Sequence, residues 1–415
     1  MRTLVASRPN TMNGRLFYGW VIVAASWLVL FIAYGLQFSY GVFVKAIETE
    51  LGWSRAETAL PYSIYVLVYS ALSSATGLAT DRLGPRRVVA LSSIVLAVGW
   101  GLSSRVQEPW QLGVTLGVVA AVGMSGTWAP CNGTVVRWFT RLRGTAVAVS
   151  TTGGSFGNLV VPAIAAAVVA TRGWRWTLAS LAIIAGLSIL AVSRLFIRDP
   201  ETIGAYPDGD TSPPPPAEDP TAVDVRWSRP FLLVVGAYGL TWLAVFIPFI
   251  HGAAFAEDLG VSPVRAATVI SAMGLGGIIG RLLTGSISDR LGRYPTLLTM
   301  FGLETGAFVV FAFATGLTWL WPAAALFGFS YGGGVALFPP LCGDIWGRTH
   351  AGAIVGAAFA RAGSTAAVGP WLAGWLYDAS GDYQSSFLFG AVVNLLGFGM
   401  VAALAFDQRA ARPST

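Results

Sequence analysis

The residue whose type and position could do chemistry most directly is an arginine inside an apolar segment. Arg281 stands in AMGLGGIIGRLLTGSIS (272–288), with no acidic residue within one helical turn. A cation near the centre of a bilayer costs roughly 2.5–3.5 kcal/mol, so it usually faces a cavity or a partner. A guanidinium presents a planar fork of donors that matches a carboxylate. Arg281 is therefore predicted to bind a carboxylate substrate.

A second arginine, Arg361, also lies inside an apolar segment. Counted from the inner ends of their predicted helices, the two arginines lie about eight and about ten residues in, or roughly 12–16 Å at 1.5 Å per residue. They would reach a similar depth from adjacent helices, so Arg361 is predicted to add charge to the same site. The alternative for either arginine is a hydrogen bond to helix carbonyls, or an ion pair with Glu304, the only acid deep in an apolar segment.

A charged turn follows the segment of Arg281 and occurs twice in the chain. It reads Gly-x3-Asp-Arg-x-Gly with further arginines close behind, and its aspartates, Asp81 and Asp289, are 289 − 81 = 208 positions apart. Glycine permits close helix contact and a positive φ in a tight turn. The aspartate can pair with the arginines or with the N-terminus of a neighbouring helix. A loop that needs only positive charge would not require this spacing. The two turns comprise Gly77, Asp81, Arg82, Gly84, Arg86, Arg87, Gly285, Asp289, Arg290, Gly292 and Arg293.

Apolar helices must position these residues, because the chain is 54% hydrophobic and only 11% charged, against roughly 25% charged residues in soluble proteins. Apolar runs of about 20 residues, the length that crosses ~30 Å of hydrocarbon, occur twelve times. The predicted helices cover 17–44, 57–79, 86–104, 109–136, 144–171, 174–196, 230–255, 264–287, 294–315, 318–341, 351–376 and 384–406.

The sequence thus predicts an all-α membrane protein with two six-helix halves. Between the halves, the run TSPPPPAEDP predicts a loose, extended linker. The predicted divisions are a tail over 1–16, the first half over 17–197, the linker over 198–229, the second half over 230–406 and a tail over 407–415.

Basic residues are concentrated in one set of predicted loops. If the N-terminus is cytoplasmic, the inner loops and tails hold 18 of the 26 Lys and Arg residues, the outer loops hold six, and Arg281 and Arg361 are the other two. Because cytoplasmic loops carry the excess of Lys and Arg, both termini are predicted to be cytoplasmic. The net charge of +6 then belongs to the inner membrane face, and no nucleic-acid partner is expected.

The sequence lacks the residue patterns of metal sites, disulfide frameworks, phosphate-binding loops and enzyme active sites. Two cysteines and two histidines, all far apart, give no metal-ligand spacing and no disulfide framework. The glycine clusters are not followed by the Lys-Ser/Thr of a phosphate-binding loop. We find no nucleophile, acid–base pair or metal site near the arginines. The chain is therefore not expected to be an enzyme, to hold a cofactor or to need a protein partner.

The doubled turn, with twelve helices in two halves, resembles the major facilitator superfamily over the whole chain. That resemblance implies that the turns act as a latch for the inward-closed gate. Narrower motifs are similar to bacterial members of the monocarboxylate transporter family. They are Phe17-Tyr18-Gly19-Trp20, Leu51-Gly52-Trp53-Ser54-Arg55, Asp81-Arg82-Leu83-Gly84-Pro85-Arg86-Arg87, Arg137-Trp138-Phe139-x-Arg141-x-Arg143-Gly144-x-Ala146, Asp199-Pro200-Glu201, Tyr206-Pro207-Asp208-Gly209 and His251 with Asp258-x-Gly260.

The chain also departs from the mammalian members of that family. Their helix-one lysine has no counterpart, since the nearest positions are Gln37 and Phe38. Their acid one turn before the helix-eight arginine is replaced by Gly277. Arg361 instead resembles the second cation of the related oxalate–formate exchangers. These differences put the mammalian scheme of proton transfer in doubt here.

The resemblance places helices one, four, seven and ten around a central cavity. The polar and aromatic residues of these helices are predicted to contact the substrate, with interhelical packing as the alternative for each. They are Tyr34, Gln37, Trp128, Asn132, Trp242, His251 and Tyr331. Asp258, with Glu257, is predicted to accept a proton or to pair at a gate, and the alternative is a plain surface carboxylate.

These observations predict a secondary transporter of lactate- or pyruvate-like carboxylates in a bacterial inner membrane. Proton symport is the expected coupling, because moving a carboxylate alone against an inside-negative potential costs ~2.3 kcal/mol per charge per 100 mV. Exchange of a dicarboxylate for a monocarboxylate is the alternative, since there are two cations and no matched buried acid. Drug efflux is a weaker alternative, because the cavity is expected to be positive.

Overall fold

The computed structural model is almost entirely helical, and it describes residues 11–12, 15–53, 55–213, 220–261 and 263–410. Apart from a two-stranded pairing of β1 (Thr11–Met12) with β2 (Arg15–Leu16), the described elements are helices. Those of the first half are α1 (Gly19–Phe38), α2 (Tyr40–Leu51), α3 (Arg55–Leu83), α4 (Pro85–Ser103), α5 (Pro109–Leu112), the π-helical η1 (Gly113–Ala120), α6 (Ala121–Trp138), α7 (Arg143–Arg172) and α8 (Trp174–Ser193). Those of the second half are α10 (Arg229–Asp258), α11 (Pro263–Leu291), α12 (Arg293–Ala312), α13 (Leu317–Trp346), α14 (Ala351–Thr365), α15 (Gly369–Ser380) and α16 (Gln384–Ala410).

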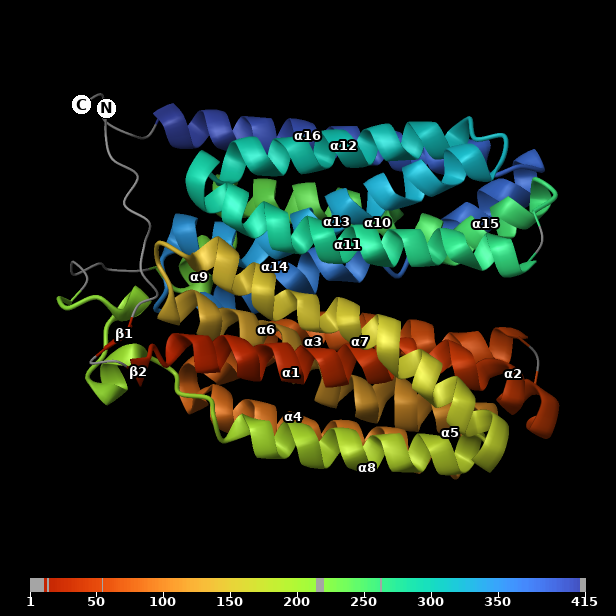
Figure 1. Ribbon diagram of the computed structural model, residues 1–415, viewed down its shortest axis with the longest axis horizontal. Coiled ribbons are helices and arrows are strands. Elements are labelled where there is room, and N and C mark those ends of the chain that lie inside the picture. Colours follow the sequence, from red (N-terminus) through yellow and green to blue (C-terminus); the bar gives the residue numbers. More distant parts are fainter. Residues whose placement is uncertain (1–10, 13–14, 54, 214–219, 262, 411–415) are drawn as a thin grey trace.

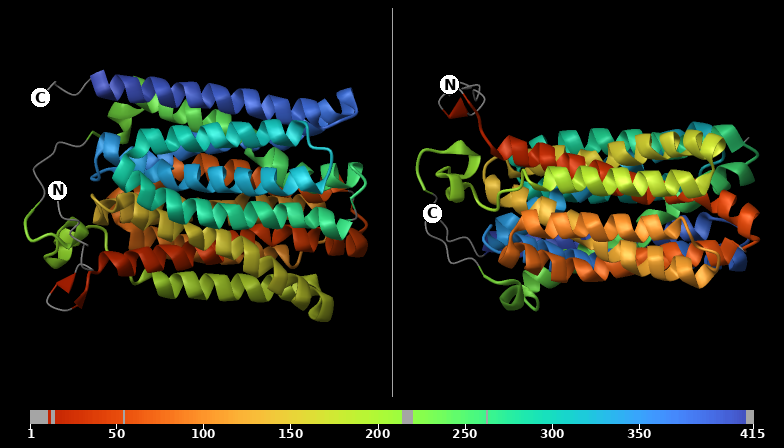
Figure 2. Two further views of the ribbon diagram at one scale, coloured as in Figure 1. Left: turned by 45° about the horizontal axis from the view of Figure 1, so that its top comes forward. Right: turned by 90° about the horizontal axis from the view of Figure 1, so that it is seen from below.

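The long helices run side by side along one axis (Figures 1 and 2). Helices α1–α8 form one bundle and α10–α16 the other, and the two meet where α3 packs on α14 and α7 packs on α11. Both charged turns, the beginning of α1 and the end of α16 lie at one end of the molecule (Figure 1). We call this the latch end.

Eleven helices in the described part of the chain are long and apolar enough to cross a membrane. The segment predicted as one helix over 351–376 is instead divided into α14 and α15 by a turn at residues 366–368. The break precedes Gly369-Pro370. Proline supplies no backbone N–H and disfavours helix before it. At Gly369, an added Cβ would lie 1.8 Å from the carbonyl oxygen of Leu243, so α15 packs directly against the backbone of α10.

Glycines of the repeated turn set the close packing of the halves. A Cβ at Gly77 of α3 would lie 2.2 Å from the carbonyl oxygen of Gly352, which belongs to α14. A Cβ at Gly285 of α11 would lie 2.3 Å from the Cβ of Ala148 and 2.7 Å from the oxygen of Gly144, both in α7. The prediction that these glycines permit close helix contact is confirmed.

Replacing Gly77 by alanine is expected to lower the thermal stability of the detergent-solubilised protein. The methyl group would overlap a backbone carbonyl, and overpacking of this kind costs about 1–3 kcal/mol. Gly306→Ala is the matched control, because the space beside Gly306 in α12 is open and alanine favours helix over glycine by up to about 1 kcal/mol. The melting temperature should therefore fall for Gly77→Ala and stay level or rise for Gly306→Ala. Equal shifts in the two variants would contradict the packing argument.

The linker is ordered in its first part. It forms two short 3₁₀ turns, η2 (Pro200–Ile203) and η3 (Pro207–Gly209), and later the short helix α9 (Ala222–Val225). The buried carboxylate of Asp208 accepts hydrogen bonds from the backbone N–H groups of Thr140 (2.9 Å), Arg141 (2.8 Å) and Leu142 (3.3 Å). The run for which a loose chain is predicted begins at Thr211, and before it one aspartate fastens the linker to the loop between α6 and α7. Residues 214–219 of the proline-rich run lie outside the described residues.

Candidate functional site

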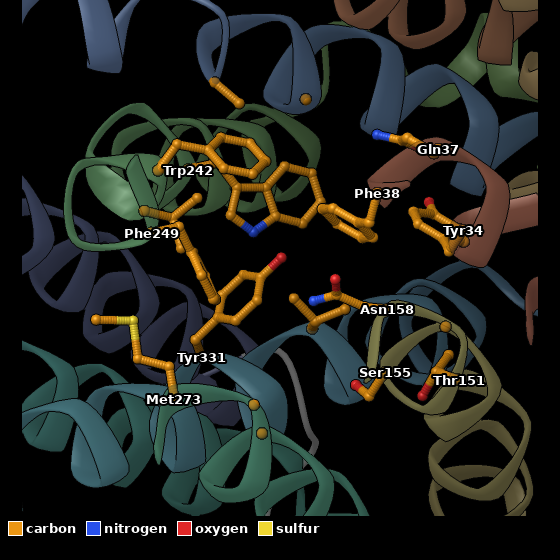
Figure 3. A pocket seen from close by; sticks show the side chains of 18 of the residues that line it. Tyr34, Gln37, Phe38, Thr151, Ser155, Asn158, Trp242, Phe249, Met273 and Tyr331 are labelled. Atoms are coloured by element: carbon orange, nitrogen blue, oxygen red, sulfur yellow. The ribbon is translucent and has the colours of Figure 1, made fainter. Parts of the chain in front are cut away.

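A central cavity of about 310 Å³ lies between the two halves (Figure 3). The first half contributes residues from α1, α3, α6 and α7, and the second half from α10, α11, α13 and α14. Its lining consists of Tyr34, Gln37, Phe38, Tyr62, Tyr69, Trp128, Thr151, Gly154, Ser155, Asn158, Trp242, Val245, Phe246, Phe249, Ile270, Met273, Gly274, Gly277, Arg281, Tyr331, Val335, Phe359, Gly363 and Ala366.

Arg281 lines this cavity from α11. Its Nη1 donates to the hydroxyl of Ser155 on α7, and its guanidinium carbon lies 5.8 Å from the centre of the Tyr331 ring. Within the described residues, its Nε has no hydrogen-bond partner and no acidic side chain reaches ion-pair distance of the guanidinium. The cation therefore lines the cavity without an acidic partner among the described residues, and it can pair with an anion that enters.

A polar stripe on α7 faces the same space. Thr151, Ser155 and Asn158 are spaced by four and three residues, so they share one helix face, and all three line the cavity. Figure 3 shows Asn158, Ser155 and Thr151 along the cavity side of this helix, with the Tyr331 hydroxyl directed toward the middle. The sequence analysis missed these residues. The signal that could have found them is the spacing of four and three residues, which puts the three on one helix face in a segment that also contains Ser150 and Thr152.

The structure brings five of the seven predicted contact residues to the cavity and leaves two elsewhere. Tyr34, Gln37, Trp128, Trp242 and Tyr331 are in the lining. Two aromatic positions on α3, Tyr62 and Tyr69, and one on α14, Phe359, line it as well and were not predicted.

Asn132 and His251 are not in the lining. Asn132 is fully buried in α6, where its amide donates to the carbonyl of Trp128 (2.9 Å). His251 lies with its Nδ1 3.3 Å from the hydroxyl of Tyr383, within the second half. The predicted contact of these two residues with substrate is not supported by this geometry.

Arg361 is also outside the cavity, contrary to the prediction that it shares the site of Arg281. Its Nη1 donates to the carbonyl of Ala357 (2.9 Å), and its guanidinium carbon lies 5.4 Å from the ring of Phe231, near the beginning of α10. The prediction compared only how deep the two arginines lie in the membrane. It did not consider toward which side of its helix each side chain points. Phe359 faces the cavity, and a position two residues later points about 200° away around a helix.

The acidic candidates lie away from the cavity lining. Glu304 is buried in α12, and neither carboxylate oxygen has a hydrogen-bond partner among the described residues, so it does not neutralise Arg281. Asp258 is exposed at the end of α10. The side chain of Glu257 lies outside the described residues.

The first charged turn binds the other half of the molecule. One oxygen of Asp81 pairs with Nη2 of Arg137 at 2.7 Å, and the other accepts the backbone N–H of Ala353 at 2.7 Å. Ala353 lies in the first turn of α14, where a carboxylate is favoured by the helix dipole. The same Arg137 also donates to the carbonyl of Thr349. The turn after α3 therefore holds the beginning of α14.

The second turn makes the matching contact in the opposite direction. Asp289 accepts from the backbone N–H groups of Gly144 (2.9 Å) and Thr145 (2.7 Å) and from the Thr145 hydroxyl (2.6 Å), at the beginning of α7. It also pairs with Arg293 at 2.6 Å. Asp344 of α13 bridges Arg293 (2.7 Å) to Arg143 (2.5 Å) of the first half.

The remaining residues of the two turns serve geometry or stay at the surface. Gly84 and Gly292 have φ of 85° and 94°, a region that favours glycine. The exposed arginines of the turns are Arg82, Arg86, Arg87 and Arg290. The aspartates and glycines of the turns thus join the two halves at the latch end.

The linker adds a further connection at the latch end. Asp199 pairs with Arg137 and with Arg198, both at 2.7 Å, and Glu201 pairs with Arg348 of the second half. Burial alone would raise the pKa of Asp199, but the two arginines outweigh it and hold that pKa below its ordinary value. This carboxylate is charged at neutral pH, and it extends the network of Asp81 and Arg137 to the linker.

Comparison with known proteins agrees with this architecture. A family model described as "Major Facilitator Superfamily" matches residues 26–364. Human "Monocarboxylate transporter 11" is 28% identical over 398 residues, covering 92% of this chain and 81% of that protein. "Monocarboxylate transporter 13" of Rattus norvegicus is 25% identical, covering 93% and 89%, and "MFS transporter asaE" of Aspergillus flavus is 26% identical, covering 92% and 85%.

Solved structures share the fold at low sequence identity. The transporter FucP, solved in the outward conformation, superposes with a TM-score of 0.73 at 14% identity and covers 94% of this chain and 99% of its own. The human organic anion transporter MFSD10 superposes with a TM-score of 0.70 at 16% identity and covers 92% and 99%.

Proposed function

Because this chain belongs to the major facilitator superfamily, whose members are solute transporters and not enzymes, we propose that it carries organic monocarboxylates by alternating access. The single observation that carries the proposal is Arg281, a cation that faces the cavity without an acidic partner among the described residues. Binding a carboxylate there would neutralise the cation and lower the cost of enclosing both charges. The similarity to monocarboxylate transporters 11 and 13 supports the same class of substrate.

The latch contacts suggest how the halves move. Asp81 and Asp289 each hold the beginning of a helix in the opposite half, so the latch end is the closed end in this conformation. We place the latch end in the cytoplasm, because 18 of the 26 basic residues fall in the loops and tails predicted for that side. The similarity of the motifs to bacterial family members supports a bacterial inner membrane. In this proposal, rocking of the halves about the central site breaks these contacts and exposes Arg281 to the cytoplasm.

Proton symport remains the proposed coupling. Entry of a carboxylate alone against an inside-negative potential costs ~2.3 kcal/mol per charge per 100 mV, and a proton that accompanies it removes that cost. The exposed Asp258 at the end of α10 is the proposed proton acceptor. Exchange with a dicarboxylate is less well supported, because Arg361 lies outside the cavity and Arg281 is the one cation among the described residues of the lining.

The proposal is tested by uptake into proteoliposomes. Labelled lactate, 3-phenyllactate and oxalate would each be offered with and without an inward proton gradient, with protein-free liposomes as the control. We expect the gradient to raise uptake of a monocarboxylate at least fivefold. Uptake that requires internal counter-substrate and ignores the gradient would replace symport by exchange. No uptake of any carboxylate under either condition would overturn the proposed substrate class.

A further inference from the structure

The walls of the central cavity are far more aromatic than a site for a three-carbon acid requires. Its charged and amide groups are few, and they are Arg281, Asn158 and Gln37, with hydroxyls from Thr151 and Ser155. The ring-bearing residues outnumber them and come from both halves. They are Tyr34, Phe38, Tyr62, Tyr69, Trp128, Trp242, Phe246, Phe249, Tyr331 and Phe359.

Four of these rings form a continuous row that crosses between the halves. Tyr34 and Trp128 of the first half lie with ring centres 6.0 Å apart in an edge-on contact. Trp128 lies 5.9 Å from Phe359 of the second half, and Phe359 lies 5.3 Å from Trp242, again edge-on. These are the separations and angles at which aromatic rings attract one another. A further ring entering the cavity would find partners in both halves.

Arg281 and the polar residues of α7 occupy one part of the lining, whereas Gln37 lies apart from them and donates to the hydroxyl of Tyr62 (3.3 Å). Ser155 and Arg281 are hydrogen-bonded to each other, and Asn158 follows Ser155 on the same face of α7. In Figure 3, Asn158, Ser155 and Thr151 lie together on one helix, whereas Trp242 lies across the open middle of the cavity from them. The cavity therefore has a polar side and an aromatic side.

The size of the cavity separates small from larger acids. A volume of about 310 Å³ falls at the lower end of pockets for drug-sized ligands, which run from ~300 Å³ upward. A lactate-sized acid would occupy a fraction of this space and leave the aromatic side in contact with water. A carboxylic acid with one aromatic ring would fill both sides.

We propose that the substrate is a monocarboxylate that carries an aromatic ring. Its carboxylate pairs with Arg281 beside Ser155 and Asn158, and its ring packs against the row formed by Trp128, Phe359 and Trp242. This inference rests on the proposed function and narrows its substrate from small carboxylates to aromatic ones. Because the row includes residues of both halves, the ring would also bridge the halves when the cavity closes around it.

The test is a series of 2-hydroxy acids that differ only in the group on carbon three. Lactate, 3-phenyllactate and 3-(indol-3-yl)lactate would compete for binding to the purified, detergent-solubilised protein, with the amide of 3-phenyllactate as an uncharged probe. We expect the two aromatic acids to bind at least tenfold tighter than lactate and the amide to bind at least tenfold weaker than 3-phenyllactate.

A pair of variants separates the ring site from general damage. Phe359→Leu should reduce the preference for 3-phenyllactate over lactate at least threefold. Phe313→Leu is the matched control, because Phe313 is 61% exposed after α12 and lies outside the lining, and it should keep the wild-type preference.

The outcomes test the aromatic substrate separately from the proposed carboxylate transport. Lactate binding as tightly as the aromatic acids would overturn the aromatic assignment and leave carboxylate transport in place. The amide binding as tightly as the acid, or none of the acids binding, would overturn the carboxylate function itself. An unchanged preference in Phe359→Leu would show that the ring does not use this row.

Discussion

Transport of carboxylate is expected to fall at least thirtyfold when Arg281 is replaced by glutamine. In the described structure this guanidinium is the cation of the cavity lining. Removing one partner of a buried, hydrogen-bonded charge pair costs about 2–5 kcal/mol in binding, and the lower bound of that range corresponds to about thirtyfold. Arg281→Lys keeps the charge but loses the planar fork, so we expect it to retain part of the binding and to lie between wild type and Arg281→Gln.

The stability of the Arg281→Gln protein should change in the opposite direction to its activity. The wild-type cation is held in the membrane interior by one hydroxyl, that of Ser155, and by the face of Tyr331. Replacing it by a neutral amide removes part of a desolvation cost of roughly 2.5–3.5 kcal/mol. The melting temperature without ligand should therefore stay level or rise, while the stabilisation that a carboxylate gives to wild type should disappear. A variant that is inactive because it is unfolded would show the reverse.

Arg361→Gln is the matched control for this experiment. The substitution also removes a guanidinium from an apolar helix. In wild type, however, the guanidinium of Arg361 donates to the carbonyl of Ala357 and lies over the ring of Phe231, outside the cavity. Transport should stay within twofold of wild type. If Arg361→Gln abolished carboxylate binding and Arg281→Gln did not, the anion site would lie at Arg361, and the cavity described above would not be the substrate site.

The sequence predicted the structure best where a charged residue has few possible environments in a membrane protein. A buried cation has to find a cavity or a partner, and Arg281 does line the cavity. Two copies of one charged turn have to serve equivalent places, and Asp81 and Asp289 each cap a helix of the opposite half. In both cases the cost of an unsatisfied charge in an apolar medium leaves few alternatives.

The failures share a different physical cause, which is direction around a helix. Arg361 was assigned to the cavity from its depth, and Asn132 and His251 from their helix and their polar character, but none of these fixes the face on which a side chain lies. A rotation of about 100° per residue turns a neighbour of a lining residue away from the site. The stripe of Thr151, Ser155 and Asn158 shows the remedy, because helical spacing among several polar residues does define a face.

The order of the linker could not be predicted from composition. The TSPPPPAEDP run predicts a loose chain for its own residues and says nothing of Asp208 before it, which binds three backbone N–H groups in the loop between α6 and α7. Such a contact joins segments that are far apart in sequence, so no local sequence pattern predicts it. The same holds for the pairs of Asp199 with Arg137 and of Glu201 with Arg348, whose members are 62 and 147 positions apart in the sequence.

Replacement of Asp289 by asparagine is expected to open the latch end and to lower transport at least fivefold. In wild type, Asp289 binds two backbone N–H groups and a hydroxyl at the beginning of α7, and it pairs with Arg293. Hydrogen bonds to a charged group contribute about 1.5–3 kcal/mol each. The loss of one such contribution would shift the balance between closed and open latch about ten- to a hundredfold.

Distances between spin labels would measure that shift. Arg86→Cys and Arg290→Cys place labels on exposed residues of the first and second half at the latch end, and the native Cys131 and Cys342 are buried. The distance distribution of the labelled Asp289→Asn protein should gain a longer component that is minor in the parent.

Asp407→Asn controls for loss of a carboxylate at the same end of the molecule. Asp407 pairs at 3.0 Å with Arg229, whose side chain is 74% exposed and belongs to the same half, so the contact holds nothing across the interface. This variant should keep both the parent distances and the parent transport. An unchanged distance distribution in Asp289→Asn would contradict the latch. Because transport requires each conformation in turn, a latch that is permanently open should slow the cycle as effectively as one that never opens.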